Sequence, residues 1–308
     1  MPQPIWQCGS YRVNLIKRPL IMGILNVTPD SFSDGGLFAN SEQAVDHALL
    51  MEHTGADIID IGGESTRPNA SPVPAEEELR RVLPVIKMLS RKVKIPLSID
   101  TTKAEVARLA IDHGVSIIND ISGLTRDPDM RAIAAKSKVG LILMHAKGTP
   151  ETMQRSPRYK NVVCEVYRFL EGQIRHAMEG GISKIRLVVD PGIGFGKTAN
   201  HNLALINHLA DFLPLGVPIL IGPSRKSFIG RVLTDETKSG RSPSPPCRPL
   251  KERDHLASLT FFRWEGTAAA VAISILRGAR IIRVHDVAPM MRVARVADAI
   301  CKGRIYSA

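Results

Sequence analysis

Cysteines are few in this chain, and long apolar runs are absent. The four cysteines (Cys8, Cys164, Cys247 and Cys301) are scattered and form no CxxC pair, which argues against a disulfide framework or a structural zinc site. No apolar stretch reaches the ~18 residues that a membrane-spanning helix needs. The N-terminal segment also lacks the apolar core and the cleavage site of a signal peptide. We therefore expect a protein of the reducing cytoplasm.

Aromatic residues are scarce as well, whereas aliphatic and basic residues are common. Hydrophobic residues make up 44% of the chain and aromatic residues 5%, a balance typical of a core built from Val, Ile, Leu and Ala. The net charge of +11 is compatible with nucleic-acid binding, but the basic residues are spread along the chain. We expect solvated helix faces and one site for a small anion, with neither nucleic acid nor membrane as partner.

The most informative pattern is a short apolar run, rich in β-branched residues, that recurs eight times and stops at a polar residue. Helix-like segments separate nearly all of the runs, and this alternation predicts a parallel sheet covered on both faces. Eight units in 308 residues predict one (β/α)8 TIM-barrel domain over 1–308, with its active site at the C-terminal strand ends. The runs end at Asn26, Ser65, Asp100, Asn119–Asp120, His145, Asp190, Lys226 and His285.

Several segments depart from this alternation. Residues 5–16 predict a β-hairpin that plugs the N-terminal mouth of the barrel. Ser41 predicts the N-cap of a helix that runs to about Gly55. The basic, Pro-rich insertion near 236–260 cannot pack a core, so we expect an exposed flexible loop whose deletion leaves turnover intact. A small-residue helix is predicted to follow from Gly266.

Three strand ends offer hydrogen-bond acceptors. Asp100, Asn119 and Asp190 each close a buried strand, and buried carboxylates are costly without partners. A flat ligand rich in N–H donors, such as the 2-amino-4-oxo edge of a pterin or guanine, would satisfy them. The alternative is a structural network that binds loop amides, which is more plausible for any one of these residues than for all three.

Cations gather at other strand ends. Arg67, Lys226, Arg283 and His285 follow candidate strands, and Ser227 adds a hydroxyl where a helix opens. Free N–H groups at a helix N-terminus attract anions, and TIM barrels often bind phosphate after strands seven and eight. Together these residues predict an anion pocket, although each alone could be a surface ion-pair residue.

Asn26 is an uncharged oxygen ligand at the end of the first run. Because Mg²⁺ takes few protein ligands when phosphate supplies the rest, Asn26 could help to hold a metal–pyrophosphate complex. The alternative is an Asn that only caps the following loop.

The PGIGFGKT loop after Asp190 contains a glycine-rich string but not the GxxxxGK[ST] of a P-loop. Its Phe195 could cover a flat ligand or simply anchor the loop on the barrel rim. His145 is interpreted as a satisfied core or loop residue. No nucleophilic apparatus is apparent, which favours dissociative chemistry by positioning and charge stabilisation.

The chain closely resembles the dihydropteroate synthase family in a series of segments that follow the family order. They are IMGILNVTPDSFSDGG (21–36), DIIDIGGESTRPN (57–69), LSIDT (97–101), IINDISG (117–123), LMHAKGTPETMQ (143–154), VVDPGIGFGK (188–197), SRKSFIG (224–230) and RVHDV (283–287). The resemblance implies a folate-pathway transferase that condenses 6-hydroxymethyl-7,8-dihydropterin pyrophosphate with 4-aminobenzoate in an SN1-like reaction. It also implies a homodimer and a Mg²⁺ cofactor.

The resemblance also implies roles for individual residues. Lys226, Arg67, Asp100 and Asp190 are expected to carry catalysis. The pterin side takes Asp100, Asn119, Asp190 and Lys226; the pyrophosphate and Mg²⁺ side takes Asn26, Arg67, Arg283 and His285; the 4-aminobenzoate side takes Thr66, Phe195, Lys226 and Ser227.

Two other functions fit part of the pattern. A barrel that presents methyltetrahydrofolate to a corrinoid would share the acidic strand ends but would not need the SRK and RVH cations. A pterin-binding scaffold without turnover would be expected to have lost Asn26, Arg67, Lys226 or His285, and all four are present.

Overall fold

Eight parallel strands form one sheet in the order β8-β7-β6-β5-β4-β3-β10-β9. A parallel bridge between Val189 and Ile219 joins β8 to the segment that leads into β9, which closes the sheet into a barrel. The computed structural model describes residues 4–28, 36–65, 70–149, 151–235 and 252–304. The strands are β3 Leu20–Asn26, β4 Ile58–Gly62, β5 Leu97–Asp100, β6 Ile117–Asp120, β7 Gly140–Met144, β8 Leu187–Asp190, β9 Leu220–Ile221 and β10 Ile281–Val284. The predicted TIM barrel is confirmed.

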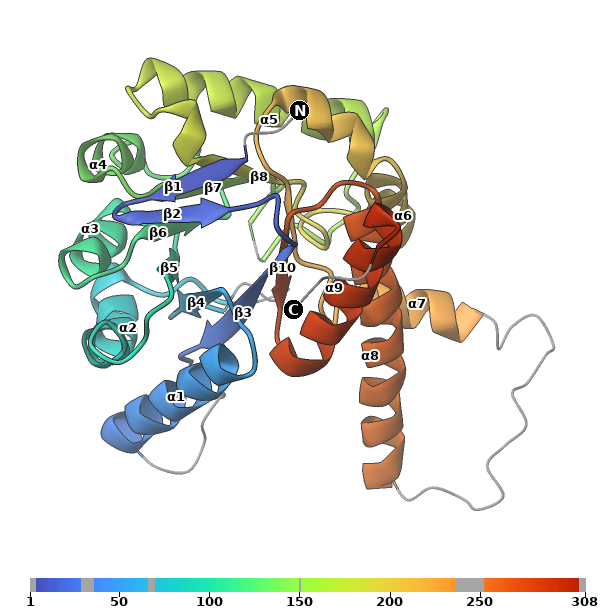
Figure 1. Cartoon of the computed structure of the whole chain (residues 1–308), viewed down its shortest axis with the longest axis horizontal. Helices are drawn as coiled ribbons and strands as arrows, with labels where there is room; N and C mark the ends of the chain where they lie inside the picture. Colours follow the sequence, from blue (N-terminus) through green and yellow to red (C-terminus); the bar gives the residue numbers. More distant parts are fainter. Residues whose placement is uncertain (1–3, 29–35, 66–69, 150, 236–251, 305–308) are drawn as a thin grey trace.

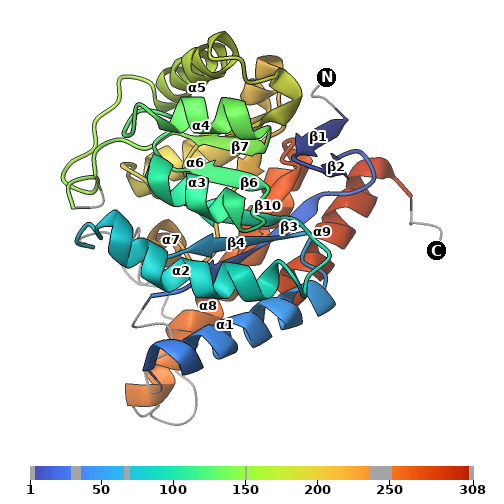
Figure 2. The same cartoon turned by 90° about the vertical axis from the view of Figure 1, so that its left-hand side faces the viewer.

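Helices surround the sheet, as Figure 1 shows. The two views together show α1 and α2 side by side over β3 and β4 (Figures 1 and 2). The helices are α1 Gly36–His53, α2 Ala75–Leu89, α3 Ala104–Asp112, α4 Met130–Ser137, α5 Val162–Glu179, α6 Ala199–Asn207, α7 Ser227–Asp235, α8 Glu252–Leu276 and α9 Val287–Lys302, with short 3-10 helices at Lys184–Arg186 and Leu209–Leu215. In the part of the chain that the structure describes, no helix combines the length and apolarity needed to cross a membrane.

Strand periodicity decides which side chains reach the barrel interior. In β4, Ile59 and Ile61 belong to the large apolar layer between sheet and helices, whereas Ile58 belongs to a second cluster that fills the barrel. Because successive strand residues point to opposite faces, Asp60 points inward with Ile58. The same alternation directs Asp100, Asn119 and Asp190 inward.

An N-terminal hairpin of β1 Ile5–Cys8 and β2 Tyr11–Asn14 covers one mouth of the barrel. Trp6 and Cys8 are fully buried against inward residues from the start of the barrel strands. The Trp6 indole Nε1–H also donates to the carbonyl oxygen of Arg186 at 2.8 Å. The predicted plug is thus present, and it leaves the C-terminal mouth for the site.

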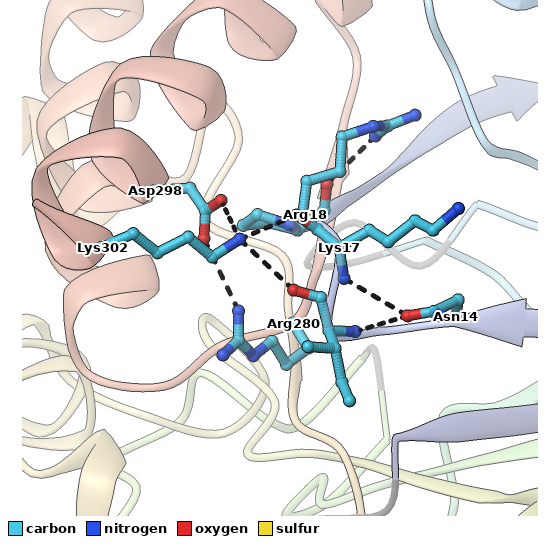
Figure 3. Close-up of polar contacts among 8 residues, drawn as sticks. Asn14, Lys17, Arg18, Arg280, Asp298 and Lys302 are labelled. Carbon is cyan, nitrogen blue, oxygen red and sulfur yellow. Dashed lines mark hydrogen bonds and ion pairs between the residues drawn. The ribbon is translucent and has the colours of Figure 1, made fainter. Parts of the chain in front are cut away.

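The C-terminal helix ties down the connection between this hairpin and β3 (Figure 3). Lys302 Nζ donates to the carbonyl oxygens of Ile16 at 3.3 Å and Lys17 at 2.7 Å, and to the Asp298 carboxylate at 2.8 Å. Arg280 lies 3.6 Å from the same carboxylate. These contacts fasten α9 beside the plugged end of the barrel.

Two predicted boundaries are wrong. Helix α1 begins at Gly36 rather than at Ser41, so Ser41 lies inside the helix and is not its N-cap; a single capping residue is a weak local signal. Helix α8 begins at Glu252, so residues 252–260 are helical rather than part of a flexible loop. The prolines of the insertion end at Pro249, and nothing in 252–260 breaks a helix. Residues 236–251 lie outside the described part.

Candidate active site

Arg283 forms the centre of the polar mouth of the barrel. Its Nε donates to Asp60 Oδ2 and one terminal nitrogen donates to Asp100 Oδ2, both at 2.6 Å. Asp60 is fully buried, Asp100 is 9% exposed, and the Arg283 side chain is 15% exposed. Asp60 was not among the predicted partners of this arginine, although a carboxylate inside the apolar run IIDIG is a usable signal.

The Asp60 carboxylate also orients Asn119. Asn119 Nδ2 donates to Asp60 Oδ2 at 3.0 Å, which turns the amide oxygen of Asn119 the other way as an acceptor. Asp60 Oδ1 and Asp100 Oδ1 are buried, and none of the described residues forms a hydrogen bond with either oxygen. The site therefore presents acceptors that a ligand rich in N–H donors would satisfy.

Two carboxyl groups at this mouth have raised pKa values. Burial raises the pKa of Asp100 to about 7, and the Arg283 guanidinium opposes the shift. Burial also raises the pKa of Asp190 to about 6, although the Gly192 N–H donates to its Oδ1 at 2.7 Å and stabilises the anion. Both groups can gain or lose a proton near neutral pH when a ligand changes their solvation.

Lys226 follows β9, beside the loop of alternating glycines that follows β8. Its Nζ stands 4.2 Å from the centroid of the Phe195 ring, a cation–π contact. A Cβ at Gly194 would lie 2.9 Å from Lys226 Cδ, so only glycine lets the lysine pass. Burial lowers the pKa of Lys226 to about 8, which leaves it mostly protonated at neutral pH.

Phe195 anchors this wall. The ring is 7% exposed and packs with Met144 and Met153 in a small apolar cluster at the ends of β7 and β8. The structure therefore bears out the loop-anchor interpretation, while the contact with Lys226 keeps the ring beside the candidate site. Whether Phe195 also covers a ligand stays a prediction.

His285 and Ser227 follow the last two strands. His285 Nδ1 lies 3.0 Å from Ser224 Oγ, and burial together with Arg283 lowers the pKa of His285 to about 3. The imidazole is thus neutral and can only donate or accept hydrogen bonds. Ser227 is the first residue of α7 and is exposed, where the helix N-terminus favours an anion.

Asn26 faces the same mouth from β3. A Cβ placed on Gly62 would lie 3.9 Å from Asn26 Oδ1 and 3.9 Å from Asp100 Oδ2. The two oxygens therefore border the same position above Gly62, where a methyl group would meet both at ordinary van der Waals distance.

The structure thus brings most of the predicted site residues to one end of the barrel. They are Asn26, Asp100, Asn119, Asp190, Phe195, Lys226, Ser227, Arg283 and His285. Thr66 and Arg67 lie outside the described residues. The individual roles of all these predicted site residues stay predictions. Two further polar residues, Asp60 and Lys197, were not predicted from the sequence.

A closed parallel barrel with acidic and cationic groups at its C-terminal strand ends defines a TIM-barrel enzyme. A model of pterin binding enzymes matches residues 22–285. Curated relatives named dihydropteroate synthase include one from Synechocystis sp., 46% identical over 92% of this chain and 91% of the relative, and one from Escherichia coli, 43% identical over 92% of each. The chain belongs to the dihydropteroate synthase family, whose members are transferases.

Solved structures agree with this assignment. The Xanthomonas albilineans dihydropteroate synthase with 4-aminobenzoic acid superposes with a TM-score of 0.82, at 43% identity over 96% of this chain and 98% of that one. The Yersinia pestis enzyme in a sulfonamide drug complex gives 0.83 at 39% identity, over 97% of this chain and 99% of that one.

Proposed function

We propose that this chain condenses 6-hydroxymethyl-7,8-dihydropterin pyrophosphate with 4-aminobenzoate, giving 7,8-dihydropteroate and pyrophosphate in folate biosynthesis. The observation that carries the proposal is the family relationship over nearly the full chain. Structures similar to this chain were solved with 4-aminobenzoic acid and with 7,8-dihydropteroate.

The acidic wall suits the pterin. We propose that Asp100, Asp190 and the amide oxygen of Asn119 accept the N–H groups of the 2-amino-4-oxo edge. The unpaired Asp100 Oδ1 supports this role, because a buried acceptor without a partner costs about 1–3 kcal/mol until a donor reaches it. Lys226 would donate to a ring acceptor from the end of β9.

The cations suit the leaving group. In the proposed reaction the bond between the pterin methylene carbon and the pyrophosphate oxygen breaks first, and its electron pair leaves with pyrophosphate. The nitrogen lone pair of 4-aminobenzoate then forms the C–N bond, and that nitrogen loses a proton. We propose that Arg283, neutral His285 and Arg67 hold the departing anion. Thr66, Phe195 and Ser227 would position the arylamine.

We propose that Mg²⁺ binds here together with pyrophosphate, which would supply most of its ligands. Among the described residues, no three His, Cys, Asp or Glu side chains are arranged to hold a metal ion, so a metal would need ligands from the substrate. Asn26 Oδ1 lies near Asp100 Oδ2 beside Gly62 and supplies the hard oxygen that Mg²⁺ prefers. Bound there, Mg²⁺ would neutralise charge on the pyrophosphate.

We further propose a cytoplasmic homodimer. The scattered cysteines support a reducing compartment. Exposed apolar side chains on α7 and α8 support a self-association face, with Val232 at 46%, Ile273 at 46% and Leu276 at 52% exposure. Sedimentation velocity of the purified chain tests the dimer directly.

The decisive assay is pyrophosphate release from the dihydropterin pyrophosphate with Mg²⁺, with and without 4-aminobenzoate. We expect release that depends on the arylamine and yields dihydropteroate. Pterin binding without release would indicate a scaffold, and absence of both would refute the proposed site.

A further inference from the structure

Lys197, the lysine of the glycine-rich GIGFGK string, is buried between the loops that follow β7 and β8. The residue is only 2% exposed to solvent. Nζ lies 2.9 Å from His145 Nδ1, 3.2 Å from the carbonyl oxygen of His145 and 3.0 Å from that of Phe195. Three acceptors match the three N–H groups of an ammonium. Burial lowers the pKa of Lys197 to about 7, and the Asp190 carboxylate opposes that shift, so the clamp is complete in the protonated form of the lysine.

His145 is the fixed partner on the other loop. Burial and the nearby Lys197 lower the pKa of His145 to about 3, so the ring is neutral and its Nδ1 accepts from the lysine. The backbone N–H of His145 donates to the Asp190 carbonyl oxygen at 3.0 Å, and the imidazole ring packs edge-on against Phe169. Lys197 therefore bonds to a rigid residue at the end of β7.

The two loops meet closely around this lysine. Tyr159 Oη donates to the Gly196 carbonyl oxygen at 2.9 Å, and Gln154 Nε2 donates to that of Gly194 at 2.8 Å. A Cβ on Gly192 would clash with the carbonyl oxygen of His145. Lys197 is the buried member of this junction, while Gln154 is exposed.

The residue next to these contacts is Phe195, whose ring contacts Lys226 on the candidate site. Lys197 Nζ donates to the Phe195 carbonyl oxygen, the backbone group of the same residue. We propose that Lys197 is a positioning residue, whose ammonium clamps the loops after β7 and β8 and thereby sets Phe195 against Lys226. The proposal rests on the proposed function for its catalytic consequence, but the clamp itself does not.

The test compares Lys197→Met with the matched control Lys160→Met, an exposed lysine in the connection between β7 and α5. Hydrogen exchange should accelerate about tenfold in residues 192–196 of Lys197→Met while the rest of the barrel stays protected. The kcat/KM for 4-aminobenzoate should fall by about 100-fold, as expected for a displacement of ~1 Å. Lys160→Met should match the wild type in both measurements.

Lys197→Arg keeps N–H donors and is expected to recover both loop protection and much of the lost kcat/KM. If Lys197→Met does not fold, Lys197→Gln replaces it, since its single amide donor also leaves the clamp incomplete. Unchanged exchange and kcat/KM in the folded variant, or exchange that rises evenly through the barrel, would overturn the proposal. If the wild type shows no turnover, the proposed function fails, whereas the exchange experiment still decides the clamp.

Discussion

Replacing Asp60 with Asn is the sharpest test of how the mouth of the barrel is held together. The substitution keeps the shape of the side chain but removes the charge that faces Arg283 Nε at 2.6 Å. Removing one partner of a buried ion pair costs about 3–5 kcal/mol, because the other charge is left uncompensated. Arg283 keeps its ion pair with Asp100 at 2.6 Å. We therefore expect the free energy of unfolding to fall by about 3 kcal/mol, at the lower end of this range.

Urea unfolding measures this loss as a lower midpoint at an unchanged m-value. The matched control is Asp112→Asn, which breaks an ion pair with Arg108 whose partners are 49% and 57% exposed. Solvent screens such a pair, so we expect about 0.5 kcal/mol or less there.

The pH dependence of catalysis should also change in the Asp60→Asn variant. The Asp60 charge raises the pKa of Asp100, so its removal should lower that pKa and shift the acidic limb of the pH–rate profile downward. If Asp60→Asn lost no more free energy of unfolding than the control and left the pH profile unmoved, the buried network described above would be refuted.

Three further predictions concern the same mouth. Asp190 is protonated in the folded state up to about pH 6, against an ordinary pKa of 3.8. The stability of the wild type therefore falls as the pH rises from about 3.8 to about 6. Across this interval Asp190→Asn should gain roughly 3 kcal/mol of stability relative to the wild type. Urea unfolding at a series of pH values measures that gain, which should not appear in Asp112→Asn. Gly62→Ala meets only ordinary contacts, the nearest at 3.6 Å, so it should fold normally yet weaken calorimetric pyrophosphate binding in the presence of Mg²⁺ severalfold; undiminished binding would argue against Asn26 as a ligand. Phe195→Ala should open Lys226 to water, an effect that we expect to outweigh the lost cation–π contact and to raise the Lys226 pKa from about 8 toward 10.5. NMR titration of the lysine side chains can follow this pKa; an unshifted titration would mean that desolvation by the ring does not outweigh that contact.

The sequence predicted the barrel because each of its strands is defined locally. Runs such as LIMGILN and PLSID combine β-branched residues with a polar last residue, and the structure places β3 at Leu20–Asn26 and β5 at Leu97–Asp100. Strand periodicity also directs the last side chain inward. The acidic strand ends could therefore be assigned to one mouth without any structure.

Helix boundaries were less well determined by the sequence. The start of α8 at Glu252 was missed because the proline-rich composition up to Pro249 suggested a loop over the whole segment. The helix itself depends on the packing of its later residues. Single caps such as Ser41 compete with equally good alternatives a few residues away.

Pairings between distant residues were decided by the tertiary structure alone. Asp60 and Arg283 are 223 positions apart, and Lys197 meets His145 across 52 positions. The sequence contains the direction of each side chain relative to its own strand, because that direction depends on local backbone geometry. Which inward side chains meet depends on how the sheet closes, and only the closed barrel turns an aspartate inside an apolar run into the partner of an arginine on β10.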